Sequence, residues 1–94
     1  MEINYGVEFS KKFIKKFRKL VKNNLVLEFK IQEIVNRMRI NPFQSGLYTH
    51  KANIKGYGEL YSTRVTGNIR IAWDFIDGTA TILAVTVGGH EIYK

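Results

Sequence analysis

The stretch ELYSTRVTGNIRIAWDFIDGTATILAVTV, residues 59–87, decides the fold because it contains three strand-like runs in succession. The intervening turns contain Gly67 and the pair Asp77-Gly78, which is typical of a tight hairpin. In the middle run, bulky apolar residues alternate with polar or small ones, so one face of the resulting sheet should be apolar. An antiparallel meander of three strands is therefore predicted: Glu59 to Val65, Asn68 to Ile76 and Thr79 to Val87.

The other face of this sheet is predicted to carry charge. Arg70 and Asp74 alternate with the apolar residues of the middle strand, and Arg64 joins them if the strands pair in the expected register. An arginine in the middle of a strand, between Ile69 and Ile71, is uncommon enough to favour a functional role. The alternative is structural, because Arg70 could pair with Asp74 on the same face.

Two helices are predicted upstream, in the half of the chain that ends at Pro42. Ser10 is a suitable N-cap for the first helix. The pair Asn23-Asn24 separates the helices, and Pro42 ends the second because proline disfavours helical geometry in the preceding residue. So short a connection predicts an antiparallel helical hairpin. Each helix has one apolar stripe, with Phe9, Phe13, Phe17, Leu20 and Val21 in the first and Leu27, Ile31, Ile34, Val35 and Met38 in the second.

A short strand is predicted before the helices, because Ile3, Tyr5 and Val7 alternate with polar or small residues. The fold class is then α+β with the order β-α-α-β-β-β. It comprises a small sheet with an antiparallel C-terminal meander and a helical hairpin packed on one face. Residues 1–94 are predicted to form a single domain, since a chain of 94 residues is near the lower end of what buries a core.

Charge and composition narrow the class of partner. Fifteen Lys and Arg against eight Asp and Glu give a net charge of +7, which favours an anionic partner such as nucleic acid or an acidic protein. The chain has no cysteine and only two lone histidines, so neither a metal site nor a cofactor is expected. No apolar run approaches the roughly 20 residues of a membrane helix. The N-terminus also lacks the pattern of a signal peptide, so we expect a soluble, cytoplasmic protein that does not contact membranes.

Basic residues are concentrated in the first predicted helix, where seven of the fifteen lie between Lys11 and Lys22. Such a run is most often a solvated helix face. It would also serve as a surface for RNA, because phosphate contacts position a nucleic acid without reading its sequence. We therefore predict an RNA-binding surface that includes two lysines of the loop before the meander: Lys11, Lys12, Lys15, Lys16, Lys19, Lys51 and Lys55.

Several segments of the second half resemble the RelE/ParE superfamily of bacterial and archaeal toxins. The pair His50-Lys51, the run GYGELYSTRV at residues 56–65 and the run GNIRIAW at residues 67–73 look like the family's glycine-bearing loop and central strands. The ending VGGHEIYK at residues 87–94 is similar to the glycine, histidine and tyrosine ending of many RelE-type members. The resemblance covers nearly the whole chain and implies the fold predicted above.

The resemblance implies a toxin of a type II toxin–antitoxin system, similar to RelE-like and YafQ-like mRNA interferases. Such members cleave mRNA on the ribosome, where they contact ribosomal RNA, and a cognate antitoxin neutralises them. By position, Arg70 matches the arginine that stabilises phosphate charge, His90 the acid or base, and Tyr93 the aromatic residue that stacks on a base or transfers a proton. The sequence departs from the family because Tyr93 follows His90 by only three residues. In addition, Leu60 and Ser62 stand where some members have basic residues.

The same residue types suit the chemistry without the family. Cleaving RNA through its 2′-hydroxyl needs a base, positive charge at the phosphate and an acid for the leaving oxygen. Imidazole, with an unperturbed pKa of about 6.5, suits the proton transfers, and His50 and His90 are the only histidines. Guanidinium is permanently charged and contacts two phosphate oxygens at once. Arg64 is therefore a candidate for phosphate positioning beside Arg70, as His50 is for catalysis.

Other interpretations stay open. His50 and His90 could be solvated loop residues at strand boundaries, and Tyr93 could only pack the C-terminus. A ParE-like toxin would share the fold and inhibit DNA gyrase without cutting RNA, and a catalytically inactive relative would only bind the antitoxin. In all three cases we predict that an antitoxin lays an acidic or amphipathic segment across the basic and apolar surface of this protein.

Overall fold

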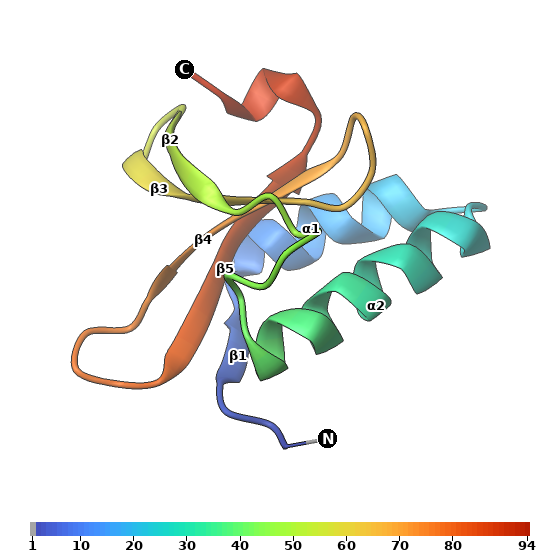
Figure 1. The fold of residues 1–94 in the computed structure, drawn as a ribbon. Helices are drawn as coiled ribbons and strands as arrows, with labels where there is room; N and C mark the ends of the chain where they lie inside the picture. Colours follow the sequence, from blue (N-terminus) through green and yellow to red (C-terminus); the bar gives the residue numbers. More distant parts are fainter. Residues whose placement is uncertain (1) are drawn as a thin grey trace.

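The computed structural model describes residues 2–94, which form a five-stranded sheet with two helices packed on one face (Figure 1). The elements are β1 (Gly6–Phe9), α1 (Lys11–Val21), α2 (Leu25–Ile40), β2 (His50–Ile54), β3 (Gly58–Arg64), β4 (Arg70–Phe75), β5 (Thr81–Gly88) and the 3-10 turn η1 (His90–Ile92). The strands lie in the order β1-β5-β4-β3-β2. β1 runs parallel to β5 and all other neighbours are antiparallel. The α+β class, the C-terminal meander and the helical hairpin on one face are confirmed.

The structure contains one strand more than the sequence predicts. His50 and Lys51 were placed in a loop, but both lie in β2, an edge strand that pairs antiparallel with β3. That placement was wrong because lysine and asparagine are poor strand formers, and HKANI carries little strand signal of its own. The strand exists through its pairing with β3, which no local pattern shows.

The first strand begins later than predicted, at Gly6 instead of Ile3. The backbone N–H groups of Asn4 and Tyr5 both donate to the carbonyl of Arg39, each at 2.9 Å. These residues therefore follow the end of α2 before the chain enters the sheet. Ile3, which the alternation assigned to the strand, is 68% exposed.

Both helices begin where the sequence predicts, and side chains cap them. The Ser10 hydroxyl accepts from the N–H of Phe13 at 2.9 Å and donates to the carbonyl of Val85 at 2.6 Å, which ties the start of α1 to β5. The Asn24 side chain accepts an N–H in the first turn of α2. Asn23 has a φ of 59°, a left-handed conformation that asparagine tolerates better than most residues. Two caps and one left-handed residue thus make the helical hairpin.

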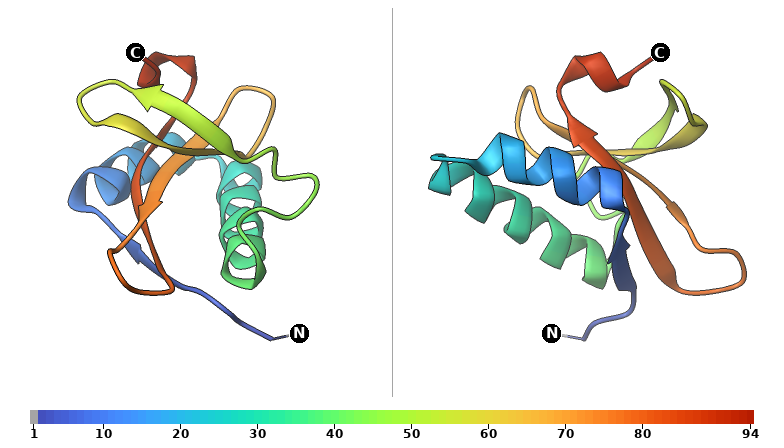
Figure 2. Two further views of the ribbon diagram at one scale, coloured as in Figure 1. Left: turned by 60° about the vertical axis from the view of Figure 1, so that its left-hand side comes forward. Right: turned by 180° about the vertical axis from the view of Figure 1, so that it is seen from behind.

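The sheet has an apolar core on each face. The larger core lies beneath the helices, and its buried members include Phe13, Ile31, Ile34, Met38, Ile71, Trp73 and Val87. A smaller core lies on the opposite face and consists of Ile54, Leu60, Ala72, Val85 and Ile92. The prediction of a charged opposite face was therefore wrong in extent, because η1 and the last residues fold back over part of it (Figure 2).

A partly buried chain of hydrogen bonds connects the central strands to the loop between α2 and β2. The indole N–H of Trp73 donates to the hydroxyl of Thr63 at 2.8 Å, and that hydroxyl lies 2.8 Å from the hydroxyl of Thr49. The Thr49 hydroxyl donates to the carbonyl of Pro42 at 2.6 Å. Because a carbonyl only accepts, the proton of Thr49 is used there, and Thr63 must donate to Thr49. The direction of every bond in this chain is thus fixed.

Candidate active site

Residues from three strands share the face of the sheet that lies opposite the helices. In antiparallel neighbours, residues directly opposite each other project to the same face. His50 of β2 pairs with Ser62 of β3, and Ser62 pairs with Ala72 of β4, a member of the smaller core. Arg64 pairs with Arg70 in the same way, as the sequence-based register predicts. His50, Ser62, Arg64 and Arg70 therefore face the side on which the C-terminal segment lies.

The C-terminal segment brings His90 and Tyr93 to this face. The backbone of Tyr93 forms a bridge with that of Ile54, and the N–H of Lys94 donates to the carbonyl of Asn53 at 2.9 Å. The hydroxyls of Tyr93 and Ser62 lie 2.7 Å apart. The exposed ring of His90 lies 5.8 Å from the ring of Tyr93, measured between centroids. The structure thus places two of the three predicted catalytic residues side by side.

Glycine at position 88 allows this approach. A Cβ atom on Gly88 would lie 2.7 Å from Oε2 of Glu91 and 2.8 Å from Cγ2 of Ile92, distances that real Cβ atoms do not show. The 3-10 turn can therefore pack against the end of β5 only because residue 88 lacks a side chain. Gly88 thus allows η1, which begins at His90, to turn closely against the end of β5.

The hydrogen bond of His50 defines its tautomer. Nδ1 of His50 lies 2.9 Å from the carbonyl oxygen of Tyr48, in an exposed position. The carbonyl can only accept, so Nδ1 carries the proton in the neutral ring and Nε2 carries the lone pair. His50 therefore presents an unprotonated nitrogen that can accept a proton from a substrate.

The two arginines of this face are held differently. Arg70 is only 8% exposed, and its guanidinium donates to two carbonyls of the β3–β4 turn at 2.7 and 3.2 Å. It bonds to this turn and not to Asp74, the structural partner considered from the sequence; the Asp74 carboxylate accepts the next backbone N–H. Arg64 is exposed, and its guanidinium carbon lies 4.5 Å from the centre of the Tyr48 ring. Arg64 is therefore the more accessible positive charge.

The predicted RNA-binding lysines do not form one surface. Lys51 pairs with Tyr61 and lies 4.3 Å from the centre of its ring, so it projects to the helical side of the sheet, away from His50. It also lies 3.9 Å from the carboxylate of Glu59. Three of the others are exposed on α1: Lys11, Lys15 and Lys19. The remaining three border one small cavity near η1: Lys12, Lys16 and Lys55.

Sequence reasoning missed two residues of this face. Ser62 is fully buried and bonds to Tyr93, although the two are 31 residues apart in the chain. Tyr48 has a φ of 53°, and it contacts both His50 and Arg64. No local sequence pattern indicates these contacts, because they depend on strand pairing and on the C-terminal segment folding back over the sheet.

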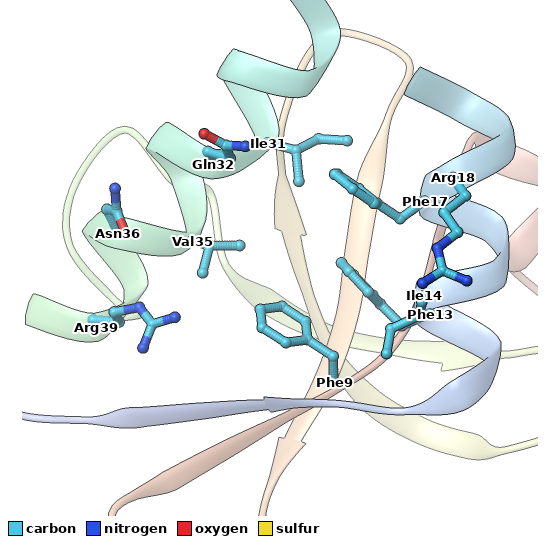
Figure 3. Close-up of a pocket in the computed structure, with 10 residues that line it drawn as sticks. All are labelled: Phe9, Phe13, Ile14, Phe17, Arg18, Ile31, Gln32, Val35, Asn36 and Arg39. Atoms are coloured by element: carbon cyan, nitrogen blue, oxygen red, sulfur yellow. The ribbon is translucent and has the colours of Figure 1, made fainter. Parts of the chain in front are cut away.

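A separate apolar groove lies on the helical side, between α1 and α2 (Figure 3). Its volume is about 450 Å³. Figure 3 shows apolar side chains from both helices and from the end of β1 around the space, with two arginines at its margins. Phe9 and Ile14 are each 37% exposed there. The lining residues are Phe9, Phe13, Ile14, Phe17, Arg18, Ile31, Gln32, Val35, Asn36 and Arg39.

Within residues 2–94, no three side chains of His, Cys, Asp or Glu lie together in a group that could hold a metal ion. Neither helix in the described part of the chain combines the length and apolar character needed to cross a membrane.

Comparison with known proteins reveals likeness in structure and not in sequence. No protein-family model matches the chain, and no curated protein matches it. A YoeB/ParE toxin from Agrobacterium tumefaciens superposes with a TM-score of 0.72 at 13% identity, covering 90% of this chain and 98% of that one. The archaeal RelE–RelB complex from Pyrococcus horikoshii superposes with a TM-score of 0.71 at 18% identity, covering 93% of this chain and 96% of that one. The DinJ–YafQ toxin–antitoxin complex from E. coli superposes with a TM-score of 0.69 at 16% identity, covering 95% of this chain and 96% of that one. This chain therefore has the fold of these toxins.

Proposed function

We propose that this chain, which has the fold of the RelE, YoeB and YafQ toxins, is the toxin of a type II toxin–antitoxin pair and cleaves mRNA on the ribosome. One observation carries the catalytic part of the proposal. His50, with its proton fixed on Nδ1, lies on the same face as the Ser62–Tyr93 pair beside His90. The two imidazoles can serve as the base and the acid, and Arg64 on the same face can supply the positive charge at the phosphate.

The proposed reaction needs no metal ion. Nε2 of His50 takes the proton of the RNA 2′-hydroxyl, and the 2′-oxygen attacks the adjacent phosphorus. The P–O5′ bond then breaks, and protonated His90 donates a proton to the leaving oxygen. The products are a 2′,3′-cyclic phosphate and a free 5′-hydroxyl. Arg64 stabilises charge at the phosphate, and the ring of Tyr93 stacks on a neighbouring base.

Cleavage sites on translated mRNA test this proposal. Expression of the wild type is expected to produce new mRNA 5′ ends within coding regions, mapped by primer extension. These ends should disappear when translation of the reporter is blocked by deleting its ribosome-binding site, because the proposed substrate is mRNA on the ribosome. Growth arrest without any new 5′ ends would contradict the nuclease proposal.

The second candidate is a toxin that does not cut RNA, either a ParE-like inhibitor of DNA gyrase or an inactive antitoxin-binding relative. The state of Arg70 favours it, because that guanidinium is buried and already donates to two carbonyls. Inhibition of gyrase supercoiling by the purified protein, in the absence of RNA cleavage, would select the ParE-like alternative. Neither activity, together with antitoxin binding, would select the inactive relative.

We also propose that the antitoxin occupies the groove between α1 and α2. Its phenylalanine lining suits the apolar side of an amphipathic segment, and Arg18 and Arg39 at its margins suit acidic residues. Ile14→Glu is expected to weaken antitoxin binding at least about tenfold, because it places a carboxylate in the apolar groove. Affinity for the product of the neighbouring gene, measured by isothermal titration calorimetry, checks this.

Val26→Glu is the matched control for that measurement. Val26 is 81% exposed on α2 and does not line the groove, so the same kind of change there should leave the affinity near the wild-type value. Equal affinities for the Ile14 and Val26 variants would place the antitoxin elsewhere.

A further inference from the structure

A cavity of about 300 Å³ near the proposed active face has the composition of an anion site. It lies between α1, the β2–β3 turn and η1. In the view from behind, η1 and the β2–β3 turn both stand above α1 (Figure 2, right). Three lysines line the cavity, two from α1 and one from the β2–β3 turn: Lys12, Lys16 and Lys55.

None of these three lysines forms an ion pair with a carboxylate of the described residues. Within residues 2–94, the ion pairs shorter than 4.0 Å join Lys30 to Glu33 and Lys51 to Glu59. One carboxylate, that of Glu91, does line the cavity, and its Oε1 accepts the N–H of Gly89 at 3.0 Å. Three ammonium groups against one carboxylate leave the cavity positive.

One residue that lines the same cavity, Thr86, has a buried hydroxyl without a hydrogen-bond partner. Thr86, on β5, is 2% exposed, and its Oγ1 is a buried side-chain polar atom without a hydrogen bond in the described part of the chain. A buried hydroxyl without a partner costs free energy, so such atoms call for an explanation. A ligand oxygen in the cavity would accept the proton of this hydroxyl and remove that cost.

We propose that this cavity binds a phosphate group of the RNA chain, held by Lys12, Lys16 and Lys55 and by a hydrogen bond from Thr86. The choice of RNA as the source of the phosphate rests on the proposed function. η1 links the two sites, because it contributes His90 to the active face and Glu91 to the cavity wall. A phosphate held here sets the position of the RNA backbone relative to His90.

Phosphate-dependent thermal stability tests the pocket without any RNA. Potassium phosphate should raise the Tm of the wild type above its value in potassium chloride of equal ionic strength, since a ligand that binds only the folded state stabilises it. Thr86→Val, which replaces the hydroxyl by a methyl group of similar size, should abolish this difference. The double variant Lys12→Gln/Lys16→Gln should do the same. The charge-matched control Lys22→Gln/Lys30→Gln, at the C-cap of α1 and on α2 and outside the cavity, should retain it.

RNA binding is measured separately, with a fluorescein-labelled 12-nucleotide RNA whose 2′-hydroxyls are all methylated, so that it cannot be cleaved. Lys12→Gln/Lys16→Gln should lower the affinity about tenfold more than the control pair. It should also reduce the slope of log K against log salt by about 0.7 for one lost phosphate contact. Because no cleavage or ribosome is involved, this result stands whether or not the protein is a nuclease.

Glu91→Gln gives a test with the opposite sign. Glutamine keeps an oxygen that can accept the N–H of Gly89, but the substitution removes the negative charge that Glu91 places in the cavity wall. Phosphate and RNA should therefore bind several-fold more tightly to this variant. A phosphate effect without any change in RNA affinity would overturn RNA as the ligand and leave free phosphate. No phosphate effect in the wild type would overturn the site.

Discussion

A His50→Asn variant is expected to cleave translated mRNA about 10²–10⁴-fold more slowly than the wild type, which is the usual contribution of a general base. The asparagine amide can still donate to the carbonyl of Tyr48, as Nδ1 of His50 does at 2.9 Å. The substitution therefore preserves the local hydrogen bond and removes only the nitrogen that accepts the proton. His90→Gln should cause a loss of the same order if His90 is the acid. Cleavage is measured as the rate of appearance of the new 5′ ends.

Asn53→Ala is the control for this experiment. Asn53 is an exposed residue of β2, three positions after His50 and thus on the opposite face of the strand. This variant should cleave RNA at the wild-type rate. Wild-type cleavage by His50→Asn alone would remove His50 from the mechanism, and wild-type cleavage by both histidine variants would overturn the nuclease proposal.

The second large effect concerns stability and involves the hydrogen bonds that connect Trp73, Thr63 and Thr49. Thr63→Val leaves the indole N–H of Trp73, which is fully buried, without its acceptor. An unpaired buried donor costs about 1–3 kcal/mol, so the free energy of unfolding in urea should fall by that amount. Because Thr63 also donates to Thr49, the α2–β2 loop should become more susceptible to proteolysis.

A double-mutant cycle separates the hydrogen bond from packing. Trp73→Phe removes the donor, so adding Thr63→Val to it should cost less than Thr63→Val costs in the wild type. Strictly additive losses would show that the valine acts through shape and not through the orphaned indole. The same urea titrations supply all four free energies.

Local patterns were enough to predict most of the fold. Ser10 and Asn24 form caps whose partners lie a few residues along the chain, and the alternation around Trp73 reports one buried face. Strand β2 was not predicted, because residues His50–Ile54 have no such pattern and form a strand only by pairing with β3. The first strand was placed too early because the alternation beginning at Ile3 does not show that the backbone of Asn4 and Tyr5 bonds to the end of α2.

The sequence predicted which residues belong to the candidate site better than it predicted how they are arranged. The register that joins Arg64 to Arg70 followed from the meander and is confirmed. The contact between Ser62 and Tyr93 could not be predicted, because it requires the C-terminus to return across the smaller core. Lys51 was grouped with the other lysines, but the two-residue period of β2 turns it to the face away from His50. The catalytic roles of Arg70, His90 and Tyr93 stay predictions.

The parallel pairing of β1 with β5 has a consequence for how the chain folds during synthesis. Ser10, which follows β1, donates a hydrogen bond to the carbonyl of Val85 in β5, and these two residues are 75 residues apart in the chain. Contacts between such distant residues carry a large loop-closure entropy and form late. During synthesis on the ribosome, β1 has no partner strand until β5 has been made, and η1, which contains His90, follows β5. The proposed active face therefore cannot form before residues 81–94 have been synthesised, although all the other strands and both helices precede them in the chain.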